Sequence, residues 1–217
     1  MNFDSIVMDF SNIKNIIFDL GDVIINISPQ RCIQAFVDIS PELDIDFVRN
    51  QFNEKQIFEK YESGFINNED FIKLVKEAIQ VYDISDEDII IAWQQILLDI
   101  PKKRIELLQK LRKKYRLFIL SNTSFYHVEE VNAILNRTCG VRNLNTLVDK
   151  VYYSFEMGVR KPEEMIYKKV IKDAEIVPSE TVFLDDNLEN IQAASNLEIH
   201  VIHVKKPTDM TDYLKNA

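Results

Sequence analysis

Five short runs of apolar residues are spaced along the chain. The clearest of them has the consecutive apolar residues Ile16, Ile17 and Phe18 instead of an alternation of apolar and polar positions, and the other four look similar. This pattern is typical of a strand that is covered on both faces, as the strands of a parallel sheet are. The pattern therefore predicts five buried strands, at residues 15–20, 116–120, 150–153, 181–184 and 199–204.

Helical patterns separate the later strands. In the segment 102–114, Ile105, Leu108 and Leu111 recur at the three-residue steps that place them on one side of a helix. Similar patterns predict helices at 125–135, 162–174 and 187–196. Strands that alternate with helices indicate an α/β fold with a doubly wound, Rossmann-like parallel sheet.

Residues 28–100 differ from the rest, because they contain helical patterns and no convincing strand. Helix starts are indicated by Pro29, by Asn67 and by Ser85, which lies three residues before Asp88. A connection between parallel strands needs only about a dozen residues. We therefore predict an inserted α-helical domain at 28–100, within a core domain formed by 1–27 and 101–217.

Composition and charge restrict the class of partner. The 217 residues are 46% hydrophobic and 28% charged, as in an ordinary globular protein, and the net charge is −9 with a pI near 4.9. Nucleic acid backbones are bound by clustered Lys and Arg, so a nucleic acid partner is not expected. A small phosphorylated substrate remains compatible, since it requires only one or two cations and a metal ion.

The cellular compartment is predicted from features that the sequence lacks. The first residues have neither the basic nor the apolar segment of a signal peptide, and no stretch approaches the roughly 18 apolar residues of a membrane span. Cys32 and Cys139 are far apart and form no ligand-spaced pair. We expect a cytoplasmic protein with reduced thiols and no membrane partner. The sequence gives no indication of the oligomeric state.

Polar residues follow the predicted strands at the point where each ends. In a doubly wound sheet, ligands bind beyond the carboxyl ends of the strands. The side chains expected at that edge are a carboxylate, a hydroxyl and an amide, an ammonium group and a pair of carboxylates: Asp19, Ser121, Asn122, Lys161, Asp185 and Asp186. Together they supply a nucleophile, groups that hold a phosphate and ligands for a hard metal ion.

Four motifs, in this order, resemble those of the haloacid dehalogenase superfamily. They read IIFDLGDVI, LFILSNT, GVRKPE and VFLDDNLENI, and they span almost the whole chain. The helical insertion after the first motif resembles the C1-type cap of subfamily I. Its segment YESGFI, with the FDLG of the first motif, resembles a branch that contains sugar-phosphate phosphatases. The resemblance implies a hydrolase, and specifically a phosphatase of a small metabolite.

The resemblance also implies roles for individual residues. Asp19 is the expected nucleophile, which forms an aspartyl-phosphate and so divides one difficult displacement into two easier ones. Lys161 is expected to hold Asp19 and the phosphoryl oxygens together. Ser121 and Asn122 are expected to donate hydrogen bonds to the phosphoryl group.

A magnesium ion is the implied cofactor, because Mg²⁺ prefers oxygen ligands. The expected ligands are a carboxylate oxygen of Asp19, the backbone carbonyl of Gly21, and Asp186. Asp185 is expected to hold the metal ligands in place without binding the ion directly, although the sequence leaves open an exchange of the roles of Asp185 and Asp186.

The chain departs from the resemblance at Gly21. Phosphatases of the superfamily usually have a second aspartate there, as the general acid and base. Asp22 is the next residue, but a neighbouring side chain along an extended segment points the opposite way. The acid–base role is therefore unassigned. A 2-haloacid dehalogenase and a regulatory or binding protein with weak catalysis remain as alternatives.

Other conspicuous residues are expected to be structural. We expect Trp93 in the core of the insertion and His127 to be packed or at the surface. Lys102, Lys103 and Arg104 are expected to be a solvated helix end.

Overall fold

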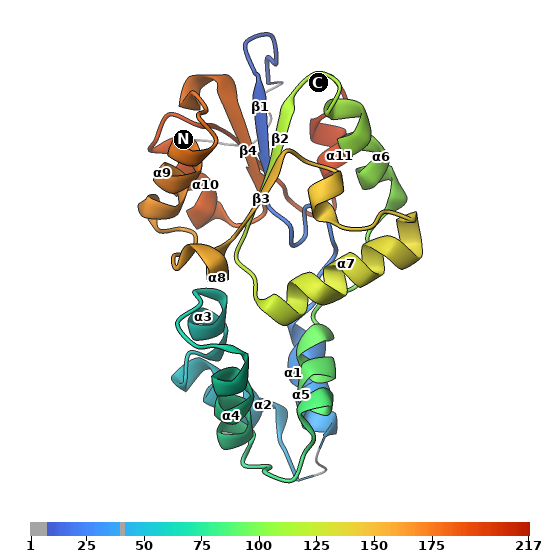
Figure 1. Ribbon diagram of the computed structural model, residues 1–217, viewed down its shortest axis with the longest axis vertical. Coiled ribbons are helices and arrows are strands. Elements are labelled where there is room, and N and C mark those ends of the chain that lie inside the picture. The colour runs from blue at the N-terminus through green and yellow to red at the C-terminus, as the bar shows by residue number, and fades with distance from the viewer. Residues whose placement is uncertain (1–7, 40–41) are drawn as a thin grey trace.

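The protein has an α/β part and a helical part, which lie one above the other along the longest axis of the molecule (Figure 1). The computed structural model describes residues 8–39 and 42–217. Residues 1–7, assigned above to the core domain, and residues 40–41, within the predicted insertion, lie outside the described residues. Among the described helices, none is both long and apolar enough to cross a membrane.

A parallel sheet of five strands forms the centre of the α/β part, in the order β3-β2-β1-β4-β5. The predicted fold class is therefore confirmed. The strands are β1 (Asn15–Phe18), β2 (Arg116–Ser121), β3 (Lys150–Tyr153), β4 (Thr181–Asp185) and β5 (His200–His203). The first strand ends two residues earlier than predicted, because the chain turns at Leu20, whose carbonyl oxygen accepts hydrogen bonds from the backbone N–H groups of Ile24 and Ile25.

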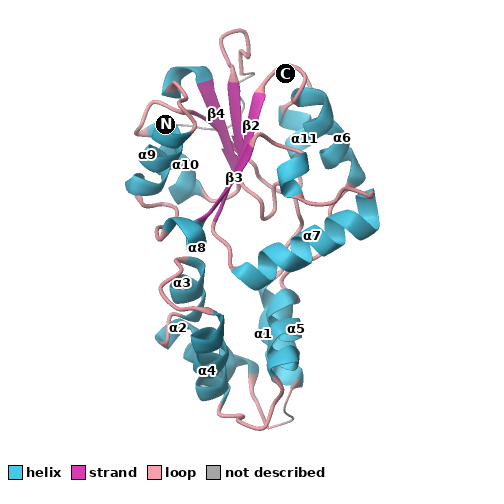
Figure 2. Ribbon diagram, in the orientation of Figure 1, coloured by secondary structure: helices cyan, strands magenta, loops and turns pink. Residues whose placement is uncertain are grey.

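Helices cover both faces of this sheet (Figure 2). Alternate residues of β1 pack on opposite faces, with Ile16 and Phe18 in one apolar cluster and Ile17 in another. This explains why Ile16, Ile17 and Phe18 are consecutive apolar residues. The helices of the α/β part are α6 (Lys102–Leu111), α7 (Phe125–Cys139), α8 (Ser154–Met157), α9 (Glu164–Asp173), α10 (Leu188–Ser195) and α11 (Met210–Tyr213), with two 3₁₀ helices, η1 (Leu144–Thr146) and η2 (Pro178–Glu180). Helices α6, α7 and α11 cover one face, and α9 and α10 cover the other.

The helical part has an apolar cluster of its own. Its helices are α1 (Pro29–Asp38), α2 (Ile45–Glu54), α3 (Ile57–Glu62), α4 (Asn68–Ile79) and α5 (Asp86–Gln94). Pro29 begins α1, and the side chains of Asn67 and Ser85 accept hydrogen bonds from the first turns of α4 and α5. Trp93 is fully buried in this cluster, as predicted.

Two chain segments that run side by side connect the two parts. The backbone N–H of Asn26 donates to the carbonyl of Asp99 at 3.0 Å, and that of Leu98 donates to Asn26 at 2.9 Å. The side chain of Asn26 also donates to the Asp99 carboxylate at 2.9 Å. The helical part is therefore attached to the α/β part by a short double connection, as an insertion that leaves and re-enters at one point.

Arg104 is not solvated, contrary to the expectation from its charged neighbours. Its side chain is only 8% exposed and forms an ion pair with Asp209 at 2.9 Å. It also donates to the carbonyl oxygen of Ile24 at 3.3 Å. A buried charge requires such partners, because leaving water without them is costly. Arg104 thus fastens the start of α6 to the cap of α11 and to the loop after β1.

Replacing Arg104 by methionine is expected to lower the free energy of unfolding by about 2–4 kcal/mol, since Asp209 then loses its buried ion pair and keeps the longer one with the exposed Lys103. Lys103→Met is the matched control. The Lys103 side chain is 57% exposed, so its loss is expected to cost less than about 1 kcal/mol. Urea unfolding of both variants measures the difference. Equal losses would contradict the buried role of Arg104.

Candidate active site

The register of the sheet brings Asp19 and Asp185 together. Phe18 pairs with Leu184 on the neighbouring strand, and the backbone N–H of Asp19 donates to the carbonyl of Leu184 at 2.8 Å. Asp19 therefore follows the end of β1 at the level where Asp185 ends β4. Both side chains are buried, Asp185 completely. Two carboxylates buried side by side require a compensating cation.

Lys161 supplies that cation. Its ammonium group lies 2.7 Å from Asp19 Oδ1 and 2.7 Å from Asp185 Oδ2. The backbone of Lys161 is fixed in turn by the amide of Asn122, which accepts from its N–H and donates to its carbonyl, both at 2.8 Å. The structure thus brings together the four predicted residues Asp19, Asn122, Lys161 and Asp185, which come from three strand ends and the loop before α9.

The hydrogen bonds distinguish the two tandem carboxylates. Asp185 accepts from the backbone of Asn187 at 2.8 Å, from Asn190 at 3.0 and 3.1 Å, and from Lys161, so both of its oxygens are occupied. The exposed side chain of Asp186 accepts no hydrogen bond from another described side chain. Asp186 is therefore the one of the pair whose oxygens are open to a ligand.

A hard cation fits this group of residues. One carboxylate oxygen from each of Asp19, Asp185 and Asp186 lies within 4.8 Å of the others. Oxygen donors with a negative charge, one of them exposed, match the preference of Mg²⁺, which keeps several of its waters. Gly21, the fourth predicted contributor, lines the same cavity.

Burial, together with the neighbouring negative charges, raises the pKa values of Asp19 and Asp186. Burial outweighs the attraction of Lys161 and raises the pKa of Asp19 to about 7, and the charge of Asp185 contributes to this rise. Partial removal from water, with the charges of Asp185 and Asp22, raises the pKa of Asp186 to about 6. Burial opposes the charge of Lys161, but the two carboxylates outweigh it and raise the lysine pKa.

These shifts predict how the stability of the metal-free protein depends on pH. Because the pKa values of Asp19 and Asp186 are raised, the folded state binds more protons than the unfolded state from about pH 4 to 7, and stability falls as pH rises through this window. Burial lowers the pKa of His127 to about 4, which acts in the opposite direction, but only below its ordinary value of 6.5. We expect a lower melting temperature at about pH 8 than at about pH 6.5.

Saturating Mg²⁺ is expected to raise the melting temperature more at the higher pH, since protons and metal compete for the same carboxylates. Differential scanning fluorimetry with and without Mg²⁺ measures both effects. A melting temperature of the metal-free protein that increases from about pH 6.5 to 8 would contradict the expected loss of stability with rising pH.

A cavity of about 450 Å³ lies between the strand ends and the helical part. The α/β part contributes Asp19, Asn122, Lys161 and Asp186 to its lining, and the helical part contributes Phe58, Glu62 and Ile96. This volume is within the range of small-molecule sites, about 300–1,000 Å³. A larger hollow of about 820 Å³, among Asp38, Val81 and Asp88, lies on the helical part. The smaller cavity is the candidate site, because it contains the carboxylates and the lysine.

The two expected phosphate donors, Ser121 and Asn122, have partners within the protein. Ser121 is buried, and its hydroxyl donates to the carbonyl oxygen of Asn122 at 3.4 Å. The Asn122 side chain lines the cavity, but one of its amide hydrogens and its oxygen hold the backbone of Lys161. Asn122 is therefore a residue that positions Lys161, with one amide hydrogen left for another acceptor.

Asp22 is held by its own contacts near the cavity. Its φ of +53° places it in the left-handed region, and its carboxylate accepts from the backbone of Ile27 at 3.2 Å and from Lys206 at 2.8 Å. Asp22 is not among the residues that line the cavity, whereas Gly21 and Ile27 are. This agrees with the expectation that Asp22 points away from the reacting group.

Sequence reasoning missed the site residues that the helical part contributes. Glu62, at the end of α3, is buried and pairs with Arg160 at 2.9 Å. A second contact between the two parts joins Trp93 to α7, where its ring nitrogen donates to Ser124 at 3.0 Å and its indole stacks on His127. Arg160 lies inside the GVRKPE motif, but its local sequence does not indicate which distant residue it meets.

Known proteins resemble the chain over almost its whole length. The D-ribitol-5-phosphate phosphatase of Bacteroides thetaiotaomicron is 28% identical over 203 residues, which are 91% of this chain and 94% of that protein.

Two solved structures also match. A HAD family enzyme from Bacteroides thetaiotaomicron, in complex with magnesium and inorganic phosphate, is 36% identical, covers 92% of this chain and 98% of its own, and has a TM-score of 0.81. A predicted HAD-like family hydrolase from Porphyromonas gingivalis is 29% identical, covers 95% and 98%, and has a TM-score of 0.85. The family model for haloacid dehalogenase-like hydrolases matches residues 13–197, which include all the cavity carboxylates. The chain belongs to the haloacid dehalogenase-like hydrolases.

Proposed function

We propose that the protein is a magnesium-dependent phosphatase that hydrolyses a small phosphate monoester through an aspartyl-phosphate on Asp19. The observation that supports this most directly is the buried group of Asp19, Lys161 and Asp185 beside the open carboxylate of Asp186. The comparisons also support it, since one relative is named as a phosphatase and one similar structure was solved with magnesium and inorganic phosphate.

Each residue has a task in this reaction. A carboxylate oxygen of Asp19 attacks phosphorus, and the leaving oxygen departs as the P–O bond breaks. The Lys161 ammonium, 2.7 Å from Asp19, orients the nucleophile and reduces the repulsion between it and the anionic phosphate. Water then attacks the aspartyl-phosphate and releases Asp19 and phosphate. Asp19, the Gly21 carbonyl and Asp186 would hold the magnesium ion, which supplies positive charge to the phosphoryl oxygens.

Proton transfer to the leaving oxygen has no dedicated carboxylate at position 21. General acid help is worth about 10²–10⁴-fold, so its absence favours esters whose leaving group is already stable as an anion. An anomeric sugar oxygen and an aryl oxygen meet that condition. The ribitol 5-phosphate named for one relative has an alkyl leaving oxygen and does not meet it, but that name separately supports a sugar phosphate or a related compound as the substrate.

Helices α1 to α5 act as a C1-type cap in this proposal. They form a domain of residues 28–100 over a core of 1–27 and 101–217. The separate apolar cluster of these helices and the short double connection at Asn26 and Asp99 support this division. The cap excludes water from the cavity and contributes residues that contact the substrate.

The proposal is tested by measuring phosphate release from a panel of phosphate monoesters with magnesium, and halide release from 2-haloacids in parallel. We expect turnover of p-nitrophenyl phosphate and of some sugar phosphates, with no halide release. Halide release without metal would establish a dehalogenase instead. A folded protein that turns over neither panel would support a regulatory or binding role.

A further inference from the structure

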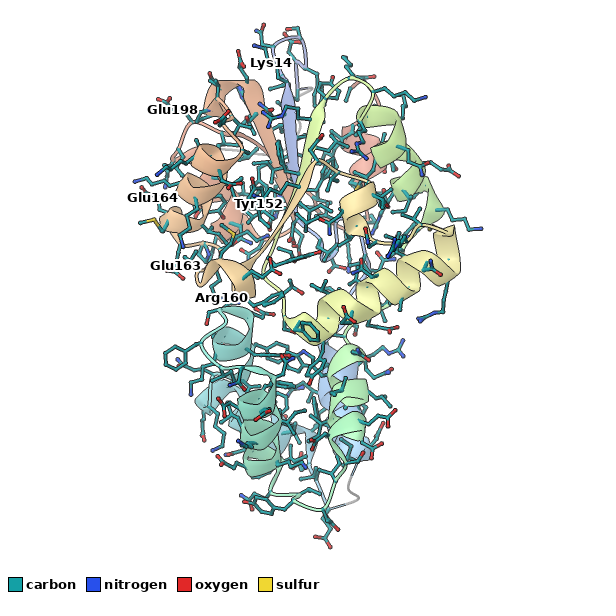
Figure 3. The ribbon with its side chains drawn as sticks, in the orientation of Figure 1. Lys14, Tyr152, Arg160, Glu163, Glu164 and Glu198 are labelled. Atoms are coloured by element: carbon teal, nitrogen blue, oxygen red, sulfur yellow. The ribbon has the colours of Figure 1, made fainter. Side chains whose placement is uncertain are left out.

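A charged pair that joins the two parts of the molecule lines the cavity. Arg160 lies at the edge of the α/β part that faces α3, close to the helical part (Figure 3). Its Nη2 donates to Glu62 Oε2 at 2.9 Å, and both residues line the cavity. The Glu62 side chain is 11% exposed and that of Arg160 is 28% exposed. The pair is therefore largely withdrawn from water but still borders the cavity.

Both members of the pair have hydrogen-bonding capacity left. Arg160 Nε is buried, and no acceptor among the described residues is within reach of it. Arg160 Nη1 lies 3.9 Å from Glu59, too far for a hydrogen bond. Arg160 is the only described side chain that donates to the Glu62 carboxylate. A charged pair that is left partly unsatisfied in a cavity suits a ligand that both donates and accepts, as a hydroxyl group does.

The backbone around Glu62 is fixed to the α/β part. The Ser154 hydroxyl donates to the Glu62 carbonyl at 2.5 Å and accepts from the backbone of Thr123 at 3.0 Å. Gly64 has φ +69°, and a Cβ there would lie 2.2 Å from the Phe155 carbonyl oxygen. Only glycine allows this close approach. The carboxylate of Glu62 is thus held at a defined place above the strand ends, as specific recognition requires.

The charges on this side of the cavity exclude one class of substrate. Glu59 and Glu62 contribute two carboxylates against the one guanidinium of Arg160. The remaining cavity-lining residues of the helical part, Pro29, Phe58 and Ile96, are apolar. A second phosphate or a carboxylate at the far end of a substrate would therefore meet net negative charge. Neutral hydroxyl groups would not.

We propose that Glu62 and Arg160 determine specificity by hydrogen-bonding the hydroxyl groups of the substrate, so that the enzyme acts on monophosphates of neutral polyhydroxylated compounds and rejects bisphosphates. This inference rests on the proposed phosphatase function and names the substrate class of that same site. Glu62 supplies the acceptor and Arg160 the donors.

The test compares three esters with the wild-type protein: D-ribitol 5-phosphate, pentyl phosphate of the same length without the hydroxyls, and ribulose 1,5-bisphosphate. The expected kcat/KM for ribitol 5-phosphate exceeds that for pentyl phosphate by about 10- to 100-fold, the range for hydrogen bonds to charged groups. The kcat/KM for the bisphosphate is expected to be lower than that for ribitol 5-phosphate, the other ester that carries hydroxyl groups. Equal rates for the first two, or preference for the bisphosphate, would overturn the inference.

Glu62→Gln tests whether the pair recognises hydroxyl groups or only joins the two parts of the molecule. The readout is the ratio of kcat/KM values for two esters, which a purely structural ion pair would not change. The substitution is expected to reduce the ratio of kcat/KM for ribitol 5-phosphate to that for pentyl phosphate by about 10-fold, mainly through KM. Glu77→Gln, an exposed position on α4, is the matched control and should leave the ratio unchanged. A proportional loss on both esters would show that the pair only holds the two parts together. Absence of hydrolysis of any phosphate ester would instead overturn the proposed function itself.

Discussion

Asp19→Asn is expected to lower kcat for p-nitrophenyl phosphate by at least about 10⁴-fold while the protein stays folded, a loss typical for removal of a nucleophile. An amide oxygen is a far weaker nucleophile than a carboxylate and cannot form the same acyl-phosphate. The fold should persist, because the asparagine oxygen can still accept the 2.7 Å hydrogen bond from Lys161. Phosphate release measures the rate, and circular dichroism with thermal melting measures folding.

Asp22→Asn is the control for this variant, since Asp22 is a carboxylate close to Asp19 in the sequence that the proposal leaves out of the chemistry. Its contacts with Ile27 and Lys206 hold it beside the cavity and not in its lining. We expect a small effect of similar size on aryl and alkyl phosphates. A large loss confined to alkyl phosphates would make Asp22 the general acid, and a folded Asp19→Asn retaining more than a few per cent of activity would exclude Asp19 as nucleophile.

Removal of divalent metal with EDTA is expected to abolish the phosphatase activity, and added magnesium is expected to restore it. Without the ion, an anionic phosphate approaches the carboxylates of Asp19, Asp185 and Asp186, which lie together at the strand ends and have only Lys161 to offset them. Repulsion then opposes both binding and attack. Full activity in EDTA would exclude the magnesium mechanism.

The two tandem carboxylates are expected to differ in this experiment. Asp186→Asn should raise the magnesium concentration needed for half-maximal activity by about 100-fold or more, with little change in melting temperature, because the Asp186 side chain is exposed and no described side chain donates a hydrogen bond to it. Asp185→Asn should lower the melting temperature as well, because the new amide cannot accept all the hydrogen bonds from Lys161, Asn187 and Asn190. If only Asp185→Asn changed the magnesium requirement, the two roles would be exchanged.

The sequence by itself predicted the elements and a set of candidate site residues. The continuous apolar runs and the three- and four-residue repeats are local signals, and they predicted all five strands and the helical insertion. Asp19, Lys161 and the Asp185–Asp186 pair could be predicted because parallel strands place their carboxyl ends at one edge of a sheet. Trp93 was predicted to lie in the core of the insertion because it continues the apolar repeat of α5, which is also a local signal.

Only the tertiary structure decided how these residues are paired. Arg104 has the sequence context of a solvated helix end, yet Asp209 and the Ile24 carbonyl, both distant in the chain, make its burial possible. The difference between Asp185 and Asp186 likewise depends on which of them Lys161 and Asn190 reach. Glu62 and Arg160 meet across 98 residues of sequence. Strand and helix formation follows short-range periodicity, whereas a hydrogen bond or an ion pair depends on distances of a few ångströms that only the packed chain defines.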